Sequence, residues 1–165
     1  MAKENSFDIV SAVDMQEVDN AFQQTKREIS TRYDLKDSGA EITLDKQGKS
    51  ITISAPADFV SKQIRDVLES KLIKRGIEIT SLKWGSPVPA TGHGVRVTAN
   101  IIDGIDKETC KKISKDIKAE KFKAKVTIEE NKLRVSSAKR DILQEIIAFL
   151  KEKDYGQPLQ YTNYR

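Results

Sequence analysis

The chain has 165 residues, of which 38% are hydrophobic, 33% are charged and 6% are aromatic. This apolar content suffices for a compact core, but no run of about 18 apolar residues exists, which excludes a transmembrane helix. The one cysteine, Cys110, cannot form an internal disulfide, and the one histidine, His93, cannot supply a histidine-rich metal site. With no apolar signal-peptide core after Met1, we expect a cytoplasmic protein that holds no metal and no cofactor.

Positive charge gathers in the second half of the chain. Residues 1–90 hold 13 Lys and Arg against 14 Asp and Glu, whereas residues 91–165 hold 16 against 11. The two halves therefore carry net charges of −1 and +5 within the total of +4. This excess permits an anionic partner such as a nucleotide or a nucleic acid.

Hydrophobic periodicity predicts regular elements throughout the chain. In the first half they are, in order, a strand over 7–12, a helix over 15–33, a hairpin over 42–54, a helix from 58 and a strand over 77–83. In the second half they are a strand over 95–101, a helix over 106–121, a hairpin over 126–136, a helix over 141–150 and a strand over 158–164. Asp14 and Asp106 stand where helix N-caps are expected. A carboxylate at this position accepts hydrogen bonds from the free N–H groups of the first turn.

The two hairpins and the helices after them recur at an offset of about 83 residues, half the chain. Each half then has the order βαββαβ, which predicts an α+β protein made of two tandem ferredoxin-like domains, also called RNA-recognition-motif-like. Each domain is a four-stranded antiparallel sheet with two helices on one face. We expect domains over 1–90 and 91–165, joined by a Pro- and Gly-rich linker at about 84–94. Each half is small for independent stability, so the first strand, 6–12, is a candidate for exchange into the second domain.

The alternation of the hairpins predicts which side chains face away from the helices. In the first hairpin the outward positions are Glu41, Thr43, Asp45, Ser50, Thr52 and Ser54, and in the second they are Lys125, Thr127, Glu129, Arg134 and Ser136. None of these residues is aromatic. Because RNA-recognition motifs stack bases on aromatic rings of this face, the composition argues against RNA stacking on either hairpin.

Several cations and one ring are candidates for binding an anion or a nucleotide: Lys74, Arg75, Arg96, Lys139, Arg140 and Trp84. Lys74 and Arg75 have an alternative role, since cations before Gly76 stabilise the negative end of a helix. Trp84 could line a groove or wedge the halves together. A second set, Lys107, Lys111, Lys115 and Lys118, forms a stripe on the helix over 106–121, which is either a solvated face or a surface that follows phosphates.

Catalytic motifs are missing from the sequence. Gly48-Lys49-Ser50 lacks the earlier glycine of a phosphate-binding loop, and it lies in a hairpin rather than between a strand and a helix. Cys110 falls on the apolar side of its helix, where a buried thiol is inert. No acid–base pair stands out, so we expect no enzyme activity.

Four strings resemble the YajQ family of bacterial nucleotide-binding proteins, in order and at matching separations over nearly the whole chain. They are Ser6-Phe7-Asp8-Ile9-Val10-Ser11, Arg32-Tyr33-Asp34-Leu35-Lys36, Lys74-Arg75-Gly76-Ile77 and Gly156-Gln157-Pro158-Leu159-Gln160-Tyr161. The resemblance implies tandem RNA-recognition-motif-like domains in a non-catalytic cytoplasmic protein. One departure is visible: where the family has Val-Ser/Thr-Gly-Lys, this chain has Val135-Ser136-Ser137-Ala138, so Lys139 is the residue that could replace the missing cation.

The resemblance also implies a ligand. We expect a purine nucleotide or a cyclic dinucleotide, because some family members are cyclic di-GMP receptors that act on transcription. We expect the binding site in a cleft between the domains. RNA or single-stranded nucleic acid is the alternative partner, and a transcription factor is a third. We expect a monomer that does not associate with membranes.

Overall fold

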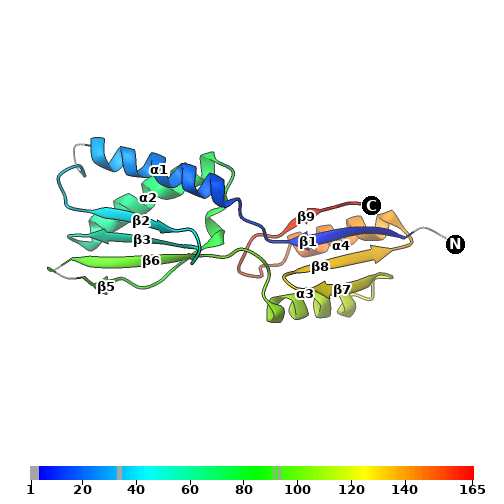
Figure 1. Cartoon of the computed structure of the whole chain (residues 1–165). Coiled ribbons are helices and arrows are strands. Elements are labelled where there is room, and N and C mark those ends of the chain that lie inside the picture. Colours follow the sequence, from blue (N-terminus) through cyan, green and yellow to red (C-terminus); the bar gives the residue numbers. More distant parts are fainter. Residues whose placement is uncertain (1–3, 33–34, 91, 93) are drawn as a thin grey trace. The chain divides into compact units, whose positions relative to one another are not determined.

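The computed structural model of the chain describes residues 4–32, 35–90, 92 and 94–165. Within them the chain has an α+β architecture, with four α-helices and two antiparallel sheets (Figure 1). It divides into two compact units, which we name the continuous unit, residues 13–102, and the split unit, residues 1–12 together with 103–165. None of the helices described is long and apolar enough to cross a bilayer.

The continuous unit places two helices on one side of its sheet (Figure 1). Its elements are α1 (Met15–Thr31), β2 (Glu41–Asp45), β3 (Ser50–Ala55), α2 (Asp58–Lys74), the 3-10 helix η1 (Ile79–Ser81), β4 (Leu82–Trp84), β5 (Val88–Pro89) and β6 (Val95–Ile101). The strands lie in the order β2-β3-β6-β4, and β5 also pairs with β6.

Local signals in the sequence explain where the helices of this unit begin and end. The Asp14 carboxylate accepts hydrogen bonds from the N–H groups of Gln16 at 3.0 Å and Glu17 at 3.4 Å, as expected for the N-cap of α1. After α2, Gly76 adopts a left-handed φ of 79°, and the Ile77 N–H donates to the Leu72 carbonyl at 2.9 Å. Tyr33, expected near the end of the first helix, lies outside the described residues.

The core of the continuous unit lies between its helices and the sheet. Ile51 and Ile53 on β3 are fully buried, whereas Thr52 between them lies on the opposite face. The residues of α1 that pack against the sheet share one stripe, namely Val18, Ala21, Phe22, Thr25 and Ile29. The inward and outward faces predicted for the first hairpin are thereby confirmed.

The split unit also covers one face of its sheet with two helices (Figure 1). Its elements are β1 (Asn5–Val10), α3 (Lys107–Ala119), β7 (Lys125–Glu129), β8 (Lys132–Ser137), α4 (Arg140–Lys151) and β9 (Gln160–Thr162). The strands lie in the order β7-β8-β1-β9. Read in this order of appearance, the elements are compatible with the expected βαββαβ arrangement.

Both ends of the chain contribute to the core of the split unit. Phe7 and Ile9 of β1 are fully buried and stand opposite Val135 and Leu133 of β8. The helices bring the apolar residues Cys110, Ile113, Ile117, Leu143, Ile146, Ile147 and Leu150 against them. Asp106 caps α3 as predicted, since its carboxylate accepts from the Thr109 N–H at 3.0 Å.

The units differ from the two halves expected over 1–90 and 91–165. Strand β1 does pair with the second hairpin, through β8, as the exchange of residues 6–12 requires. The reverse also occurs, because β6 pairs with β3 and therefore belongs to the continuous unit. The boundary expected at 84–94 is consequently wrong: β5 lies within that segment and pairs with β6, and the chain passes between the units at 12–13 and 102–103. Alternation determines which face of a strand is buried but leaves its partner undetermined.

Candidate functional site

The six predicted anion-binding residues are distributed over both units. Four of them lie in the continuous unit and two in the split unit, in the order Lys74, Arg75, Trp84, Arg96, Lys139 and Arg140. They differ in whether a neighbouring side chain already pairs with them and in whether a pocket lies beside them.

Lys74 and Arg75 lie at the end of α2. Lys74 is exposed, and Arg75 Nη1 lies 3.5 Å from Glu17 Oε2 on α1. A neighbouring carboxylate partly neutralises the guanidinium, so this ion pair and the helix end already account for both residues.

Arg96 and Trp84 lie on opposite faces of the sheet of the continuous unit. Arg96 on β6 is exposed and stands opposite Ser54, on the face without helices. Trp84 stands opposite the buried Ala99 and packs against the core of this unit, and the guanidinium carbon of Arg65 lies 4.8 Å from its ring centroid. The ring of Trp84 is therefore already stacked against a side chain of its own unit.

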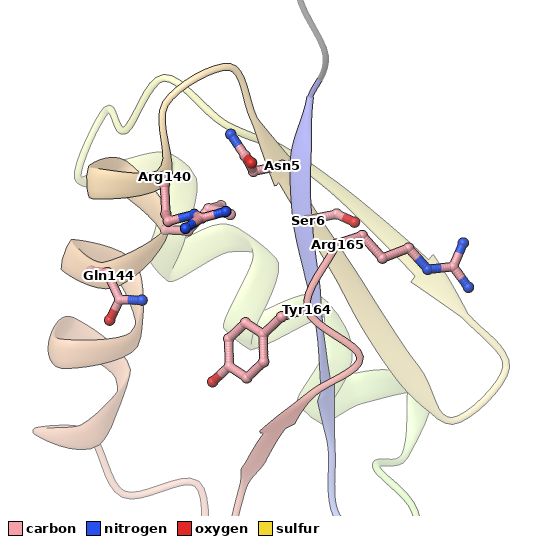
Figure 2. A pocket seen from close by; sticks show the side chains of 7 residues that line it. Asn5, Ser6, Arg140, Gln144, Tyr164 and Arg165 are labelled. Atoms are coloured by element: carbon pink, nitrogen blue, oxygen red, sulfur yellow. The ribbon is translucent and has the colours of Figure 1, made fainter.

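A pocket of about 360 Å³ lies beside the start of α4 in the split unit. Its lining comes from β1, α4 and the segment after β9, and comprises Asn5, Ser6, Arg140, Leu143, Gln144, Tyr164 and Arg165. Figure 2 shows the Arg140 side chain extending from α4 toward β1, with Gln144 further along the helix and the Tyr164 ring directed from the last segment toward α4. The side chain of Arg165 extends away from Arg140, to the other side of its strand (Figure 2).

The start of α4, where backbone N–H groups lack helical acceptors, lies beside this pocket. Its N-cap, Lys139, makes no side-chain hydrogen bond to the helix, in contrast to the aspartates that cap α1 and α3. Lys139 and Arg140 are both exposed, and no ion pair of either is found among the described residues. Free N–H groups and the helix dipole attract an anion at such an end, and two cations strengthen the attraction.

Tyr164 supplies an aromatic surface. The residue is 61% exposed, and its ring lies against Phe7, with ring centroids 6.2 Å apart and planes at 30°. Phe7 also contacts Tyr161, edge to face at 6.0 Å, so the ring of Tyr164 rests on a packed aromatic base. An exposed ring held in this way can stack a planar ligand.

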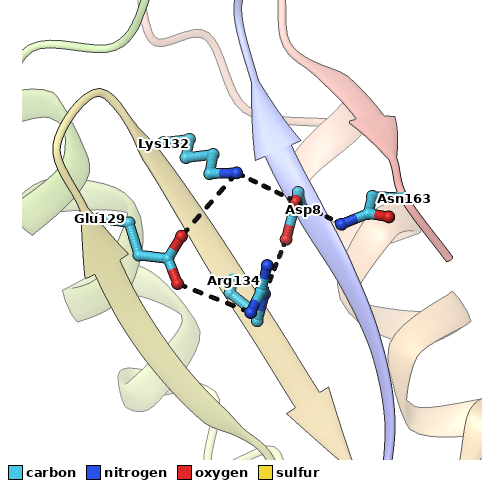
Figure 3. Close-up of polar contacts among 5 residues, drawn as sticks. All are labelled: Asp8, Glu129, Lys132, Arg134 and Asn163. Atoms are coloured by element: carbon cyan, nitrogen blue, oxygen red, sulfur yellow. Dashed lines mark hydrogen bonds and ion pairs between the residues drawn. The ribbon is translucent and has the colours of Figure 1, made fainter. Parts of the chain in front are cut away.

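The opposite face of the same sheet carries a buried carboxylate (Figure 3). The Asp8 side chain is 4% exposed and accepts hydrogen bonds from Arg134 Nε at 3.1 Å and Asn163 Nδ2 at 2.9 Å, with Lys132 Nζ at 3.4 Å. Burial raises the pKa of this carboxyl, but the hydrogen bonds from Asn163 and Arg134 and the nearby charges outweigh burial, so that the pKa lies below its usual value. This network ties both ends of the chain to β8.

The predicted lysine stripe is present on α3. Lys107, Lys111, Lys115 and Lys118 are all exposed, on the side opposite the buried Cys110, Ile113 and Ile117. The lysines lie apart from the pocket, so the two predicted surfaces are separate parts of the split unit.

A second hollow, of about 390 Å³, lies in the continuous unit between α1 and β2. It is lined by Lys26, Ile29, Ser30, Lys36, Ala40, Glu41, Ile42 and Thr43. This lining has two lysines but no aromatic ring, and it includes the carboxylate of Glu41, which repels an anion. The pocket at the start of α4 has the better chemistry for an anionic ligand with a planar group.

The lining of the α4 pocket suits binding. Its lining side chains hold guanidinium, amide, hydroxyl and phenol groups, and none of them has a carboxylate, imidazole or thiol. Within the described part of the chain, no group of three or more His, Cys, Asp or Glu side chains could hold a metal ion. The fold and the pocket define a two-unit α+β protein with a cationic, aromatic-walled cavity.

Comparison with known proteins shows the family. The family model described as "Nucleotide-binding protein YajQ-like" matches residues 5–165, and the chain belongs to this family. A relative in Carboxydothermus hydrogenoformans is 46% identical over the full length of both chains, and one in Chloroherpeton thalassium is 42% identical over the same span. A third, in Parvibaculum lavamentivorans, is 46% identical over 97% of this chain and 98% of its own. All three relatives are named nucleotide-binding proteins.

The sequence predicted only part of this pocket. Arg140 was among the candidates, as was its neighbour Lys139, whereas Asn5 and Gln144 were not, and Tyr164 was one of several aromatic residues without an assigned role. Tyr164 is the last residue of the predicted strand over 158–164, and no local pattern places it beside a helix residue 20 positions earlier.

Proposed function

We propose that the protein binds a nucleotide without transforming it, in the pocket that Arg140 and Tyr164 line. The observation that carries this proposal is that an exposed aromatic residue and a guanidinium at a helix N-terminus line one cavity. Nucleotides combine a flat base with an anionic phosphate, which are the groups that a ring and a guanidinium bind best. The names of the relatives support the same class of ligand.

Each lining residue has a role in this proposal. Tyr164 stacks the base, and Arg140 with the N–H groups of the first turn of α4 holds a phosphate. The amides of Gln144 and Asn5 can pair with the edge of the base, although the Asn5 amide also donates to the Ala138 carbonyl at 3.4 Å. The carboxylate of Asp141, in the first turn of α4, does not line the pocket.

The volume of the pocket bears on the kind of nucleotide. About 360 Å³ lies near the lower end of the range of roughly 300–1,000 Å³ typical of small-molecule sites. One purine nucleotide fits this space, and the second guanylate of a cyclic dinucleotide would extend beyond its rim. The family resemblance supports a cyclic di-GMP receptor in signalling or transcription control, acting in the cytoplasm as a monomer with a transcription factor as its partner.

We also infer that both units are ferredoxin-like. In the split unit, β1 lies between β8 and β9, so the first strand of the order βαββαβ is flanked by the third and the fourth. In the continuous unit, β6 occupies the equivalent place between β3 and β4, although it comes last in sequence. In each unit, two helices cover one face and leave the other free for a partner.

Isothermal titration of the full chain with GTP, ATP and cyclic di-GMP tests the nucleotide proposal. We expect Arg140→Ala and Tyr164→Ala each to weaken the bound nucleotide about tenfold or more, since each removes a charged hydrogen bond or a stacking surface. Arg96→Ala is the matched control, because Arg96 is an exposed arginine of the other unit and should leave affinity unchanged. No heat with any of the three ligands up to about 1 mM would overturn the proposal.

Nucleic acid is a second candidate partner, favoured by the four exposed lysines of α3. The split unit holds 16 Lys and Arg against 13 Asp and Glu, so its net charge of +3 favours a polyanion. Fluorescence anisotropy of a single-stranded RNA should show binding that weakens steeply with salt and is lost in the double variant Lys111→Glu and Lys115→Glu. Binding that neither salt nor this charge reversal changes would exclude the stripe as its site.

A further inference from the structure

The segment after β9 shifts its register against β1 by one residue. Within β9, Thr162 stands opposite Asp8 and Tyr161 opposite Ile9. Beyond β9, Ser6 and Arg165 exchange two backbone hydrogen bonds, of 3.1 Å and 2.9 Å. From Asp8 to Ser6 is a step of two residues, whereas from Thr162 to Arg165 is a step of three. One extra residue is therefore accommodated between Thr162 and Arg165, which is a β-bulge.

Asn163 occupies this bulge. Its φ of 55° lies in the left-handed region, which asparagine adopts more readily than most residues with a side chain. Its Nδ2 donates to Asp8 Oδ2 at 2.9 Å, and Asp8 is held in turn by Arg134 and Lys132 of β8 (Figure 3). A buried carboxylate thus fixes the side chain of the bulged residue to the face of the sheet away from the helices.

The bulge determines the face on which Tyr164 lies. In a regular strand, side chains two residues apart share a face, so Tyr164 would lie on the face of Thr162 and Asp8. With the extra residue, the Tyr164 ring lies on the helix-covered face, where it contacts Phe7 and lines the pocket with Leu143. Figure 2 shows the result, with Tyr164 directed toward α4 and the Arg165 side chain directed the other way.

We propose that Asn163 and Asp8 are positioning residues for the ligand pocket: their hydrogen bond holds the bulge that turns Tyr164 toward α4. This inference rests on the proposed nucleotide site, and it names the two residues that orient the stacking ring of that site. Neither residue lines the pocket, so each acts through the position of Tyr164 alone.

The test is a double-mutant cycle for GTP affinity in the full chain, with Asn163→Val, Tyr164→Ala and their combination. Valine strongly disfavours a positive φ and has no amide, so we expect Asn163→Val to weaken GTP binding about tenfold, the loss typical of one stacked base. In the Tyr164→Ala background the same substitution should have no further effect. Asn163→Gly accepts the left-handed conformation but lacks the amide, so it should lose less affinity than Asn163→Val, about threefold, and this loss reports the hydrogen bond to Asp8.

A second readout needs no ligand. The nuclear Overhauser contacts between the rings of Phe7 and Tyr164 should be present in the native chain and in Asn163→Gly, and lost in Asn163→Val. If Asn163→Val fails to fold, Asn163→Ala replaces it in the same cycle. Wild-type affinity in Asn163→Val, or in Asn163→Ala where it replaces it, would overturn the inference, and so would an equal loss in both backgrounds. Unchanged affinity in Arg140→Ala and Tyr164→Ala would instead refute the proposed site itself.

Discussion

Asp8 and Arg134 are joined by a hydrogen bond of 3.1 Å between Arg134 Nε and Asp8 Oδ1, although 126 residues separate them in sequence. The contact links the N-terminal strand β1 to the second hairpin, in the unit that the chain forms from its two ends. Asp8 is the buried charged residue of the described core, and Arg134, Lys132 and Asn163 supply the donors that compensate for its burial. The arrangement around Asp8 and the fold of the two units lead to four testable predictions.

Replacing Asp8 should destabilise the split unit. Asp8→Ala removes the carboxylate that accepts hydrogen bonds from Arg134, Lys132 and Asn163. The free energy of unfolding should fall by about 2 kcal/mol, the typical contribution of hydrogen bonds to charged groups. Urea unfolding at pH 7, followed by circular dichroism, measures the change. Asp66→Asn is the control, because Asp66 is exposed and should alter the unfolding free energy by less than about 0.5 kcal/mol. Equal stability of Asp8→Ala and the native chain would contradict a stabilising role for the network.

The contribution of Asp8 should depend on pH in a defined direction. Its folded-state pKa lies below the ordinary value, so the stabilisation is present above the unfolded-state pKa and is lost as pH falls through the folded one. The difference in unfolding free energy between the native chain and Asp8→Ala should be constant between pH 6 and 8 and should shrink below about pH 4. A difference that grows on acidification would show that the folded carboxyl has a raised pKa.

Fragments should fold according to the observed units. Residues 13–102 contain every strand of the continuous sheet, whereas residues 1–90 lack β6, which pairs with β3, β4 and β5. We expect 13–102 to unfold cooperatively and 1–90 to lack a cooperative transition, because the second fragment leaves the edge of β3 unpaired and β4 without its partner strand. Thermal denaturation monitored by circular dichroism compares them. A stable 1–90 fragment would contradict the observed exchange of strands.

Cys110 should be unreactive in the folded protein. The thiol is fully buried, and burial, with the nearby charge of Asp106, raises its pKa. Since the thiolate is the reactive form, modification by a disulfide reagent at pH 8 should be about a hundredfold or more slower than in urea. Comparable rates in the two conditions would show that α3 opens readily.

Much of the local structure was predictable from the sequence. The caps at Asp14 and Asp106, the glycine after α2 and the buried stripes of the helices all depend on residues within a few positions of one another. Such signals locate elements and their buried faces. The buried Cys110 was correctly predicted for the same reason, because it shares the stripe of Ile113 and Ile117.

The pairing of strands and the wall of the pocket were not predictable in this way. The hydrophobic pattern of 95–101 fits either unit, and only contact with β3 assigns it to the continuous one. Tyr164 reaches the pocket because Asn163 inserts one residue into the register, and that insertion depends on Asp8 at the other end of the chain. Arg140 was a candidate from its charge, whereas the ring that lines the same pocket required the tertiary structure.

Mapping a nucleotide onto the full chain by amide chemical-shift perturbation tests the central claim most directly. Titration with GTP should shift the resonances of Asn5, Ser6, Gln144 and Tyr164 and of the first turn of α4, and should leave those of the continuous unit in place. Perturbations confined to residues 13–102, around Arg75, Trp84 or Arg96, would contradict the assignment of the ligand to the α4 pocket.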